Sequence, residues 1–136
     1  MRAERLALQI VVAIGSLIPI GAGAAGIVLG PAMVDAATVP VAADSHYRYL
    51  SGLLLGIGVA FATTIPGIER RTTRFRVLTG IVVAGGLGRL VSLLLRGPPD
   101  RQMLAALVME LVVTPALALW QTRIARRGSS RDIRSA

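Results

Sequence analysis

The sequence predicts an all-α protein, a four-helix transmembrane bundle with its N and C termini in the cytoplasm. Apolar residues make up 54% of the 136 residues and the mean hydropathy is +0.68, too apolar for an ordinary soluble domain. They gather in runs of about 20 residues, the length at which an α-helix crosses the ~30 Å hydrocarbon core of a bilayer. The expected helices cover residues 6–29, 47–65, 77–95 and 103–121 of a membrane domain at 1–127.

The first run, residues 6–29, admits a second interpretation. Two early arginines, an apolar stretch and small residues at positions 22–24 also fit a secretory signal peptide with its cleavage site. Apolar character resumes at residues 27–29, beyond that site. This continuation favours a retained transmembrane helix.

The other runs are bounded by residues typical of interfaces and turns. Tyr47 and Tyr49 open the second run and Trp120 closes the fourth, as expected for the aromatic belt of a bilayer. Residues 30–45 contain two prolines and many small residues, which indicates a loop. Residues 128–136, rich in Arg and Ser, are predicted to form a basic flexible tail.

The distribution of arginine predicts the orientation of the helices. All 15 basic residues are arginines, and eleven of them lie near the termini or in the connector at residues 69–76. Arg48, Arg96 and Arg101 lie at the opposite ends of the runs. Because short cytoplasmic segments collect basic residues, both termini are expected on the cytoplasmic side of a bacterial plasma membrane.

Charge and composition also exclude several classes of function. The net charge of +8 is compatible with nucleic-acid binding, but these arginines flank apolar runs, so we expect the lipid bilayer as a partner and no nucleic acid. The chain has no Cys, which excludes disulfides and thiolate metal sites. No cofactor is expected.

Two charges inside apolar runs mark the candidate site. Arg89 and Glu110 lie at similar distances from the Gly97–Asp100 turn, so an antiparallel hairpin brings them to nearly the same depth. An unpaired charge at mid-membrane costs at least ~2.5 kcal/mol, which favours an ion pair. With Arg48 and Ser92 they are predicted to form a buried polar cluster, either as a structural bridge or as a substrate, lipid-headgroup or proton site.

Three further residues are possible accessories to this cluster. Asp44 and His46 lie just before the second run, and Thr114 shares a helix face with Glu110. One His with one Asp falls short of the three or four ligands of a stable metal site, so no metal is expected. Small-residue spacings such as Gly52-xxx-Gly56 predict close helix packing within the bundle.

The residues of the last three runs also suggest a family. Segments 47–61, 77–100 and 104–119 resemble the bacterial family known as domain of unknown function 4345, small four-helix membrane proteins. The pattern of that family corresponds here to Arg48, Gly85, Gly86, Gly88, Arg89, Gly97, Pro99, Glu110 and Leu111. The resemblance implies the fold and no assigned activity, so function is argued from the site.

Two functions are compatible with these observations. The first is a non-enzymatic accessory, interaction or lipid-binding protein, with another membrane protein or a second copy of the chain as possible partners. The alternative is a small proton-coupled transporter or carrier that uses Glu110. An enzyme is not expected, because the membrane segments lack a catalytic Cys, a His pair and a carboxylate pair.

Overall fold

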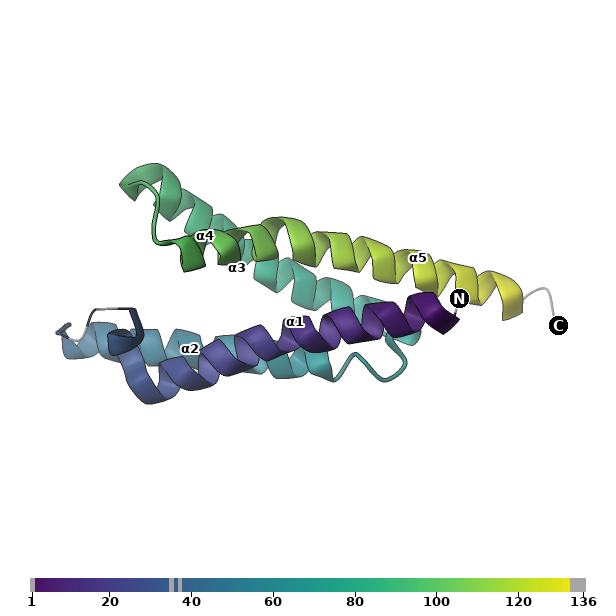
Figure 1. Cartoon of the computed structure of the whole chain (residues 1–136), viewed down its shortest axis with the longest axis horizontal. Helices are drawn as coiled ribbons and strands as arrows, with labels where there is room; N and C mark the ends of the chain where they lie inside the picture. The colour runs from purple at the N-terminus through teal and green to yellow at the C-terminus, as the bar shows by residue number, and fades with distance from the viewer. Residues whose placement is uncertain (1, 35, 37, 133–136) are drawn as a thin grey trace. The chain divides into compact units, whose positions relative to one another are not determined.

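The computed structural model describes residues 2–34, 36 and 38–132, and every element within these ranges is helical. The elements are α1 (Arg2–Leu29), the 3-10 helix η1 (Gly30–Val34), α2 (Val41–Ala62), the 3-10 helix η2 (Ile68–Arg70), α3 (Thr72–Arg96), α4 (Arg101–Val108), the π-helix η3 (Met109–Val113) and α5 (Thr114–Asp132) (Figure 1). Together α4, η3 and α5 make one continuous helix. The predicted all-helical fold class is confirmed.

Three helical stretches are long and apolar enough to cross a membrane: Arg2–Val34, Thr72–Arg96 and Arg101–Arg127. Many of their large apolar side chains are exposed, for example Leu17 at 65% and Leu94 at 76%. Helices that are apolar on every side need lipid or protein around them. The 22-residue helix α2 is long enough but less apolar than these three stretches, because its first turns contain Asp44, His46 and Arg48.

Most helices begin before the apolar runs that predicted them, whereas α2 ends at Ala62, inside its run. Helix α2 begins at Val41, within the predicted loop, and α3 begins at Thr72 rather than at residue 77. Apolar runs mark only the stretch suited to lipid, whereas helical hydrogen bonding continues until a residue such as Pro40 or Gly67 interrupts it. Gly67 has a φ of +69°, which stops the chain from continuing as a right-handed helix.

The C-terminal end follows the same rule. Helix α5 continues to Asp132, through the first part of the predicted tail, and residues 133–136 lie outside the described residues. The flexibility expected of residues 128–136 stays a prediction.

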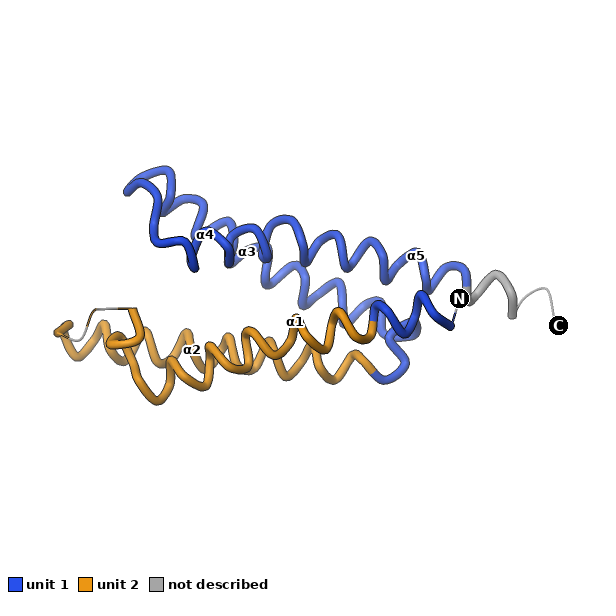
Figure 2. Tube along the Cα trace, in the orientation of Figure 1, with its two compact units in different colours: residues 1–8, 66–136 blue, residues 9–65 orange. Residues whose placement is uncertain are grey.

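Residues 9–65 form one compact unit, in which α2 packs antiparallel on α1 (Figure 2). The backbones touch at glycines: a Cβ on Gly23 would lie 2.7 Å from the Ser51 oxygen, and a Cβ on Gly58 would lie 2.9 Å from the Ile20 nitrogen. Small residues permit such approach. Within this unit a Cβ on Gly52 would meet no described atom within 4 Å, so the predicted packing through Gly52 stays a prediction.

Residues 1–8 and 66–136 form the other unit (Figure 2). Here α3 packs antiparallel on the helix α4–η3–α5. Its most buried apolar side chains lie toward the connector between α2 and α3; they are Leu8, Ile68, Phe75, Leu78 and Ile124. Burial of these side chains supplies the apolar contacts that hold this end together.

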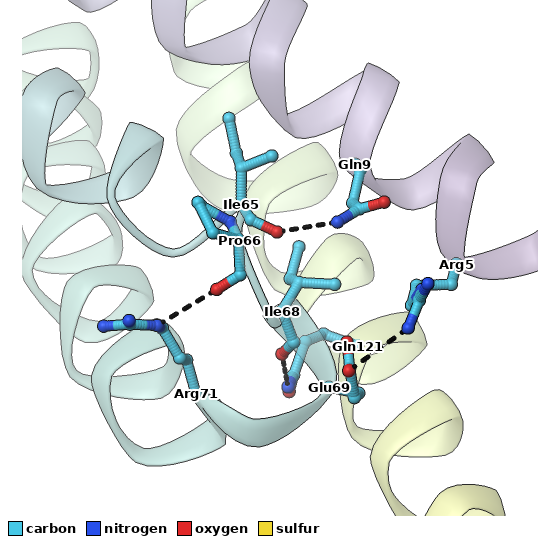
Figure 3. Close-up of polar contacts among 8 residues, drawn as sticks. All are labelled: Arg5, Gln9, Ile65, Pro66, Ile68, Glu69, Arg71 and Gln121. Carbon is cyan, nitrogen blue, oxygen red and sulfur yellow. Dashed lines mark hydrogen bonds and ion pairs between the residues drawn. The ribbon is translucent and has the colours of Figure 1, made fainter.

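Polar contacts hold the same end of this unit (Figure 3). The side chain of Gln121 is fully buried and donates from Nε2 to the Ile68 carbonyl at 2.7 Å and to the Thr72 hydroxyl at 2.9 Å. The Arg71 Nε donates to the Pro66 carbonyl at 3.2 Å. These bonds satisfy backbone carbonyls in the connector between α2 and α3, where no regular helix supplies N–H donors.

Ion pairs bring the chain's two ends together in this unit. The Arg5 Nη1 lies 3.4 Å from the Glu69 Oε1, and the Arg127 Nη1 lies 3.2 Å from the Glu4 Oε1. The start of α1, the connector and the end of α5 therefore meet at one end. In the unit of residues 9–65, the Gln9 Nε2 donates to the Ile65 carbonyl at 2.8 Å (Figure 3).

Candidate functional site

Arg89 on α3 and Glu110 on η3 form an ion pair. The Arg89 Nε donates to the Glu110 Oε1 at 3.0 Å. Counting from the Gly97–Asp100 turn placed both residues at one depth, and the antiparallel helices bring them into contact. The side chain of Glu110 is 17% exposed and that of Arg89 is 39% exposed, so the pair is accessible from one side.

The helix around Glu110 is widened by a proline. Pro115 has no N–H to donate to the Leu111 carbonyl, and its ring pushes that carbonyl away. The chain responds with the π-helical turn of η3, in which the backbone N–H of Thr114 donates to the Met109 carbonyl. The Thr114 hydroxyl donates to the same carbonyl at 2.8 Å, so Thr114 supports the turn and does not contact the ion pair.

Gly86 sets how closely the charged helices meet, and Met103 contacts the charged pair. At Gly86 an added Cβ would lie 2.7 Å from the Leu111 Cδ2 and 2.9 Å from the Glu110 Cβ, so only glycine permits this distance. Met103 contacts the pair from α4, where its Sδ lies 2.9 Å from the Arg89 Nη1. A thioether is a weak hydrogen-bond acceptor, so the Arg89 Nη1 can still donate to a stronger acceptor.

The carboxylate of Glu110 is bonded on one oxygen only. Its Oε2 is buried and has no hydrogen-bond partner within the described part of the chain. A buried carboxylate oxygen without a donor costs free energy, which a proton, a water molecule or a bound donor would recover.

A pocket of about 140 Å³ opens beside the pair. Arg89 and Ser92 form its polar wall, and the apolar wall comes from Leu93, Pro99, Met103 and Leu107. Ser92 is exposed and lines this pocket. A cation, a hydroxyl and an apolar wall together suit an acidic head group attached to a hydrocarbon chain.

The predicted buried cluster of Arg48, Arg89 and Glu110 is wrong. None of these side chains is buried, and Arg48, which is 40% exposed, makes its bonds within the unit of residues 9–65. Its Nε donates to the Asp44 Oδ2 at 2.9 Å, and its Nη1 donates to the carbonyls of Ile27 and Val28. The last carbonyls of a helix have no N–H donors within the helix and attract cations. Arg48 therefore bonds to the end of α1.

The remaining accessory residues, Asp44 and His46, belong to the unit of residues 9–65. Asp44 is engaged with Arg48, and His46 is exposed, with its ring 6.4 Å from that of Tyr49. No group of three His, Cys, Asp or Glu side chains that could hold a metal occurs in the residues that the structure describes.

The sequence pattern reveals neither the role of Met103 nor the special position of Gly86. Met103 lies fourteen residues from Arg89, and nothing in an apolar helix distinguishes this methionine from others. Gly86 is one of three glycines within four residues, and only the packing shows which of them faces Glu110. Gln121 could have been found from the sequence. A side-chain amide near the end of an apolar run needs hydrogen-bond partners when it is buried, and this predicts a contact with a neighbouring segment.

Comparison with known proteins gives one match. A family model described as domain of unknown function (DUF4345) matches residues 7–121, which include the ion pair, the pocket and Gln121. No curated protein and no solved structure matches the chain.

Proposed function

The chain belongs to the DUF4345 family, and from this premise we propose that it is a non-enzymatic membrane protein that binds the acidic head group of an amphiphile beside Arg89. The observation that supports this function is the pocket at the exposed side of the Arg89–Glu110 pair. A purely structural bridge does not require a pocket.

The guanidinium of Arg89 keeps one nitrogen without a partner in the described part of the chain and a second that has only a weak one. Glu110 accepts from its Nε and Met103 contacts its Nη1, while its Nη2 has no partner among the described residues. A guanidinium presents parallel donors that match the two oxygens of a carboxylate or phosphate. A bound head group would therefore share Arg89 with Glu110.

Position along the helix agrees with an amphiphile. Arg89 lies seven residues before Arg96, the last residue of α3, which is about 10 Å along the helix axis. The pocket is thus expected in the outer part of the membrane span, below the interface. A head group can enter there while its chain follows the apolar surface of Leu93 and Leu107.

Photolabelling with a diazirine fatty acid tests this function in the full-length protein, reconstituted in neutral vesicles. We expect labelled peptides to contain Leu93, Met103 or Leu107. The substitution Arg89→Gln should reduce this labelling at least tenfold, because it removes the cation. Arg96→Gln is the matched control, with the same change on the same helix outside the pocket.

A second variant separates loss of binding from loss of folding. Leu107→Trp fills the pocket without changing charge, and we expect it to reduce labelling as much as Arg89→Gln does. Labelling that is spread evenly along α3, or that neither variant reduces, would show that the pocket is not a binding site.

Glu110 supports a second candidate, a proton-coupled carrier. Its unpartnered Oε2 can accept a proton, and π-helical turns within longer helices are frequent at functional sites. In proteoliposomes with a pH-sensitive dye inside, a carrier predicts proton flux that Glu110→Gln abolishes. Asp100→Asn, which changes the carboxylate at the start of α4, is the control. If the unsubstituted protein moves no protons, this candidate fails.

The proposal also includes a topology. The chain crosses a plasma membrane four times, and both termini lie in the cytoplasm. The Glu4–Arg127 pair supports an even number, because three crossings would separate the two ends of the chain. Helix α2 supplies the fourth: its 22 residues measure about 33 Å. The bilayer is the partner that the proposal requires, and neither a second membrane protein nor a second copy of the chain is needed.

A further inference from the structure

A second polar surface lies at the other end of α3, in a wide groove of about 730 Å³. Its wall includes Arg70 from η2, Arg76 from α3 and Arg126 from α5. Glu69 also lines the groove, but its Oε1 pairs with Arg5, so it does not neutralise the positive charges of Arg70 and Arg76. The groove therefore attracts anions.

Donors of several kinds converge on this groove. Arg70 and Arg76 are exposed, and their side chains have no hydrogen bond or ion pair with any described residue. Thr72 and Thr122 also line the groove; the Thr72 hydroxyl accepts from Gln121 and keeps its own hydrogen, whereas the Thr122 hydroxyl already donates to the Ala118 carbonyl at 2.8 Å. Thr72 is also the first residue of α3, where the early backbone N–H groups lack a side-chain cap and the helix dipole is positive.

The groove lies at the depth of lipid head groups. Arg76 directly precedes the apolar run that starts at Val77, and Thr122 follows Trp120 by two residues. At ~1.5 Å per residue, these side chains begin within a few ångströms of the hydrocarbon boundary. An anion held here is at the height of a lipid phosphate, with the apolar surfaces of α3 and α5 beside its chains.

We propose that this groove binds the phosphate group of an anionic membrane lipid. Glu69 does not oppose this binding strongly, because its Oε1 already pairs with Arg5. The proposal is independent of the site at Arg89, which lies at the opposite end of α3 and uses different residues.

Native mass spectrometry of the full-length protein in neutral detergent tests the proposal. Phosphatidic acid is titrated against phosphatidylcholine on a background of Arg89→Gln, which removes the cation of the other pocket, and we expect one phosphatidic acid molecule to bind in clear preference. The double substitution Arg70→Gln/Arg76→Gln should weaken binding about fivefold per arginine, the equivalent of ~1 kcal/mol for each basic residue near a membrane surface.

Controls separate the groove from general electrostatics. Arg96→Gln/Arg101→Gln removes the same charge at the opposite end of α3 and should change the affinity less than twofold. Arg70→Lys/Arg76→Lys keeps the charge and should retain most of the binding. Equal weakening by both glutamine pairs would overturn the proposal, as would no preference for phosphatidic acid in the unsubstituted protein.

Soluble phosphate is distinguished in a separate arm. Inorganic phosphate and glycerol 3-phosphate are added at concentrations that match the lipid. A lipid site predicts that they do not displace phosphatidic acid, because they lack the chains that contact α3 and α5. Displacement at matched concentration would show that the groove binds a soluble phosphate and would overturn the lipid assignment.

Discussion

At the last turn of α1, the Arg48 guanidinium supplies donors that the helix itself lacks. It donates to the Ile27 and Val28 carbonyls and is held in place by Asp44, one turn earlier on α2. The adjoining Gly30 has a φ of +62°, and a Cβ there would lie 2.9 Å from the Asp44 Oδ1. Arg48 thus joins the end of α1 to the start of α2.

Arg48→Gln should therefore destabilise the protein. Its hydrogen bonds are charge-assisted, so their loss should lower the unfolding midpoint, although by less than for a buried donor because the side chain is 40% exposed. The unfolding midpoint in an SDS titration, followed by circular dichroism, measures the change. Arg96→Gln is the control, and equal midpoints for the two variants would refute the capping role.

The Arg89–Glu110 pair allows a test of its structural contribution. Glu110→Leu alone leaves Arg89 without its carboxylate partner in lipid, and we expect a loss of about 2–3 kcal/mol, the insertion cost of such a charge. The double substitution Arg89→Leu/Glu110→Leu removes both charges and should recover most of the stability. Stability is again the SDS midpoint, and a double variant no more stable than Glu110→Leu would contradict this account.

At the scale of the element, the approach of α3 to η3 depends on one side of α3. Gly86 faces Leu111 and Glu110, whereas Gly85 and Gly88 would each meet no described atom within 4 Å of an added Cβ. The separation between the helices, and with it the Arg89–Glu110 distance, is therefore set at Gly86.

Gly86→Val should force the helices apart. Overpacking of this kind costs about 1–3 kcal/mol, and the displaced backbone should also weaken the ion pair. Gly85→Val adds the same atoms where space is open and should leave the unfolding midpoint nearly unchanged. If the two variants unfold alike, the contact at Gly86 does not determine the packing.

Sequence periodicity predicted the helices and the meeting of Arg89 with Glu110, because depth in an antiparallel hairpin follows from counting residues. It did not predict the partners of Arg48. A long side chain can reach either inward along its own helix or across to a neighbouring helix end, and the choice depends on which acceptors are unsatisfied. The pocket also depends on side-chain packing around Met103, which no spacing rule reveals.

At the scale of the whole molecule, each end of α3 has a polar site of a different kind. A small pocket with a single guanidinium lies near the 97–100 turn, and a wide groove with three lies near the connector. This difference follows the distribution of arginine along the chain, which also predicts the orientation. Topology therefore determines which leaflet each site meets.

Cysteine labelling of intact cells measures that topology, since the chain has no native Cys. With four crossings, Thr38→Cys and Pro98→Cys should react with a membrane-impermeant maleimide from outside, whereas Thr73→Cys should react only after lysis. If α2 does not cross, Thr38 and Pro98 lie on opposite sides and only one of them is labelled. A fluorescent protein fused after Ala136, which matures only in the cytoplasm, should fluoresce if the proposed cytoplasmic termini are right; the Glu4–Arg127 pair supports placing both ends of the chain on one side.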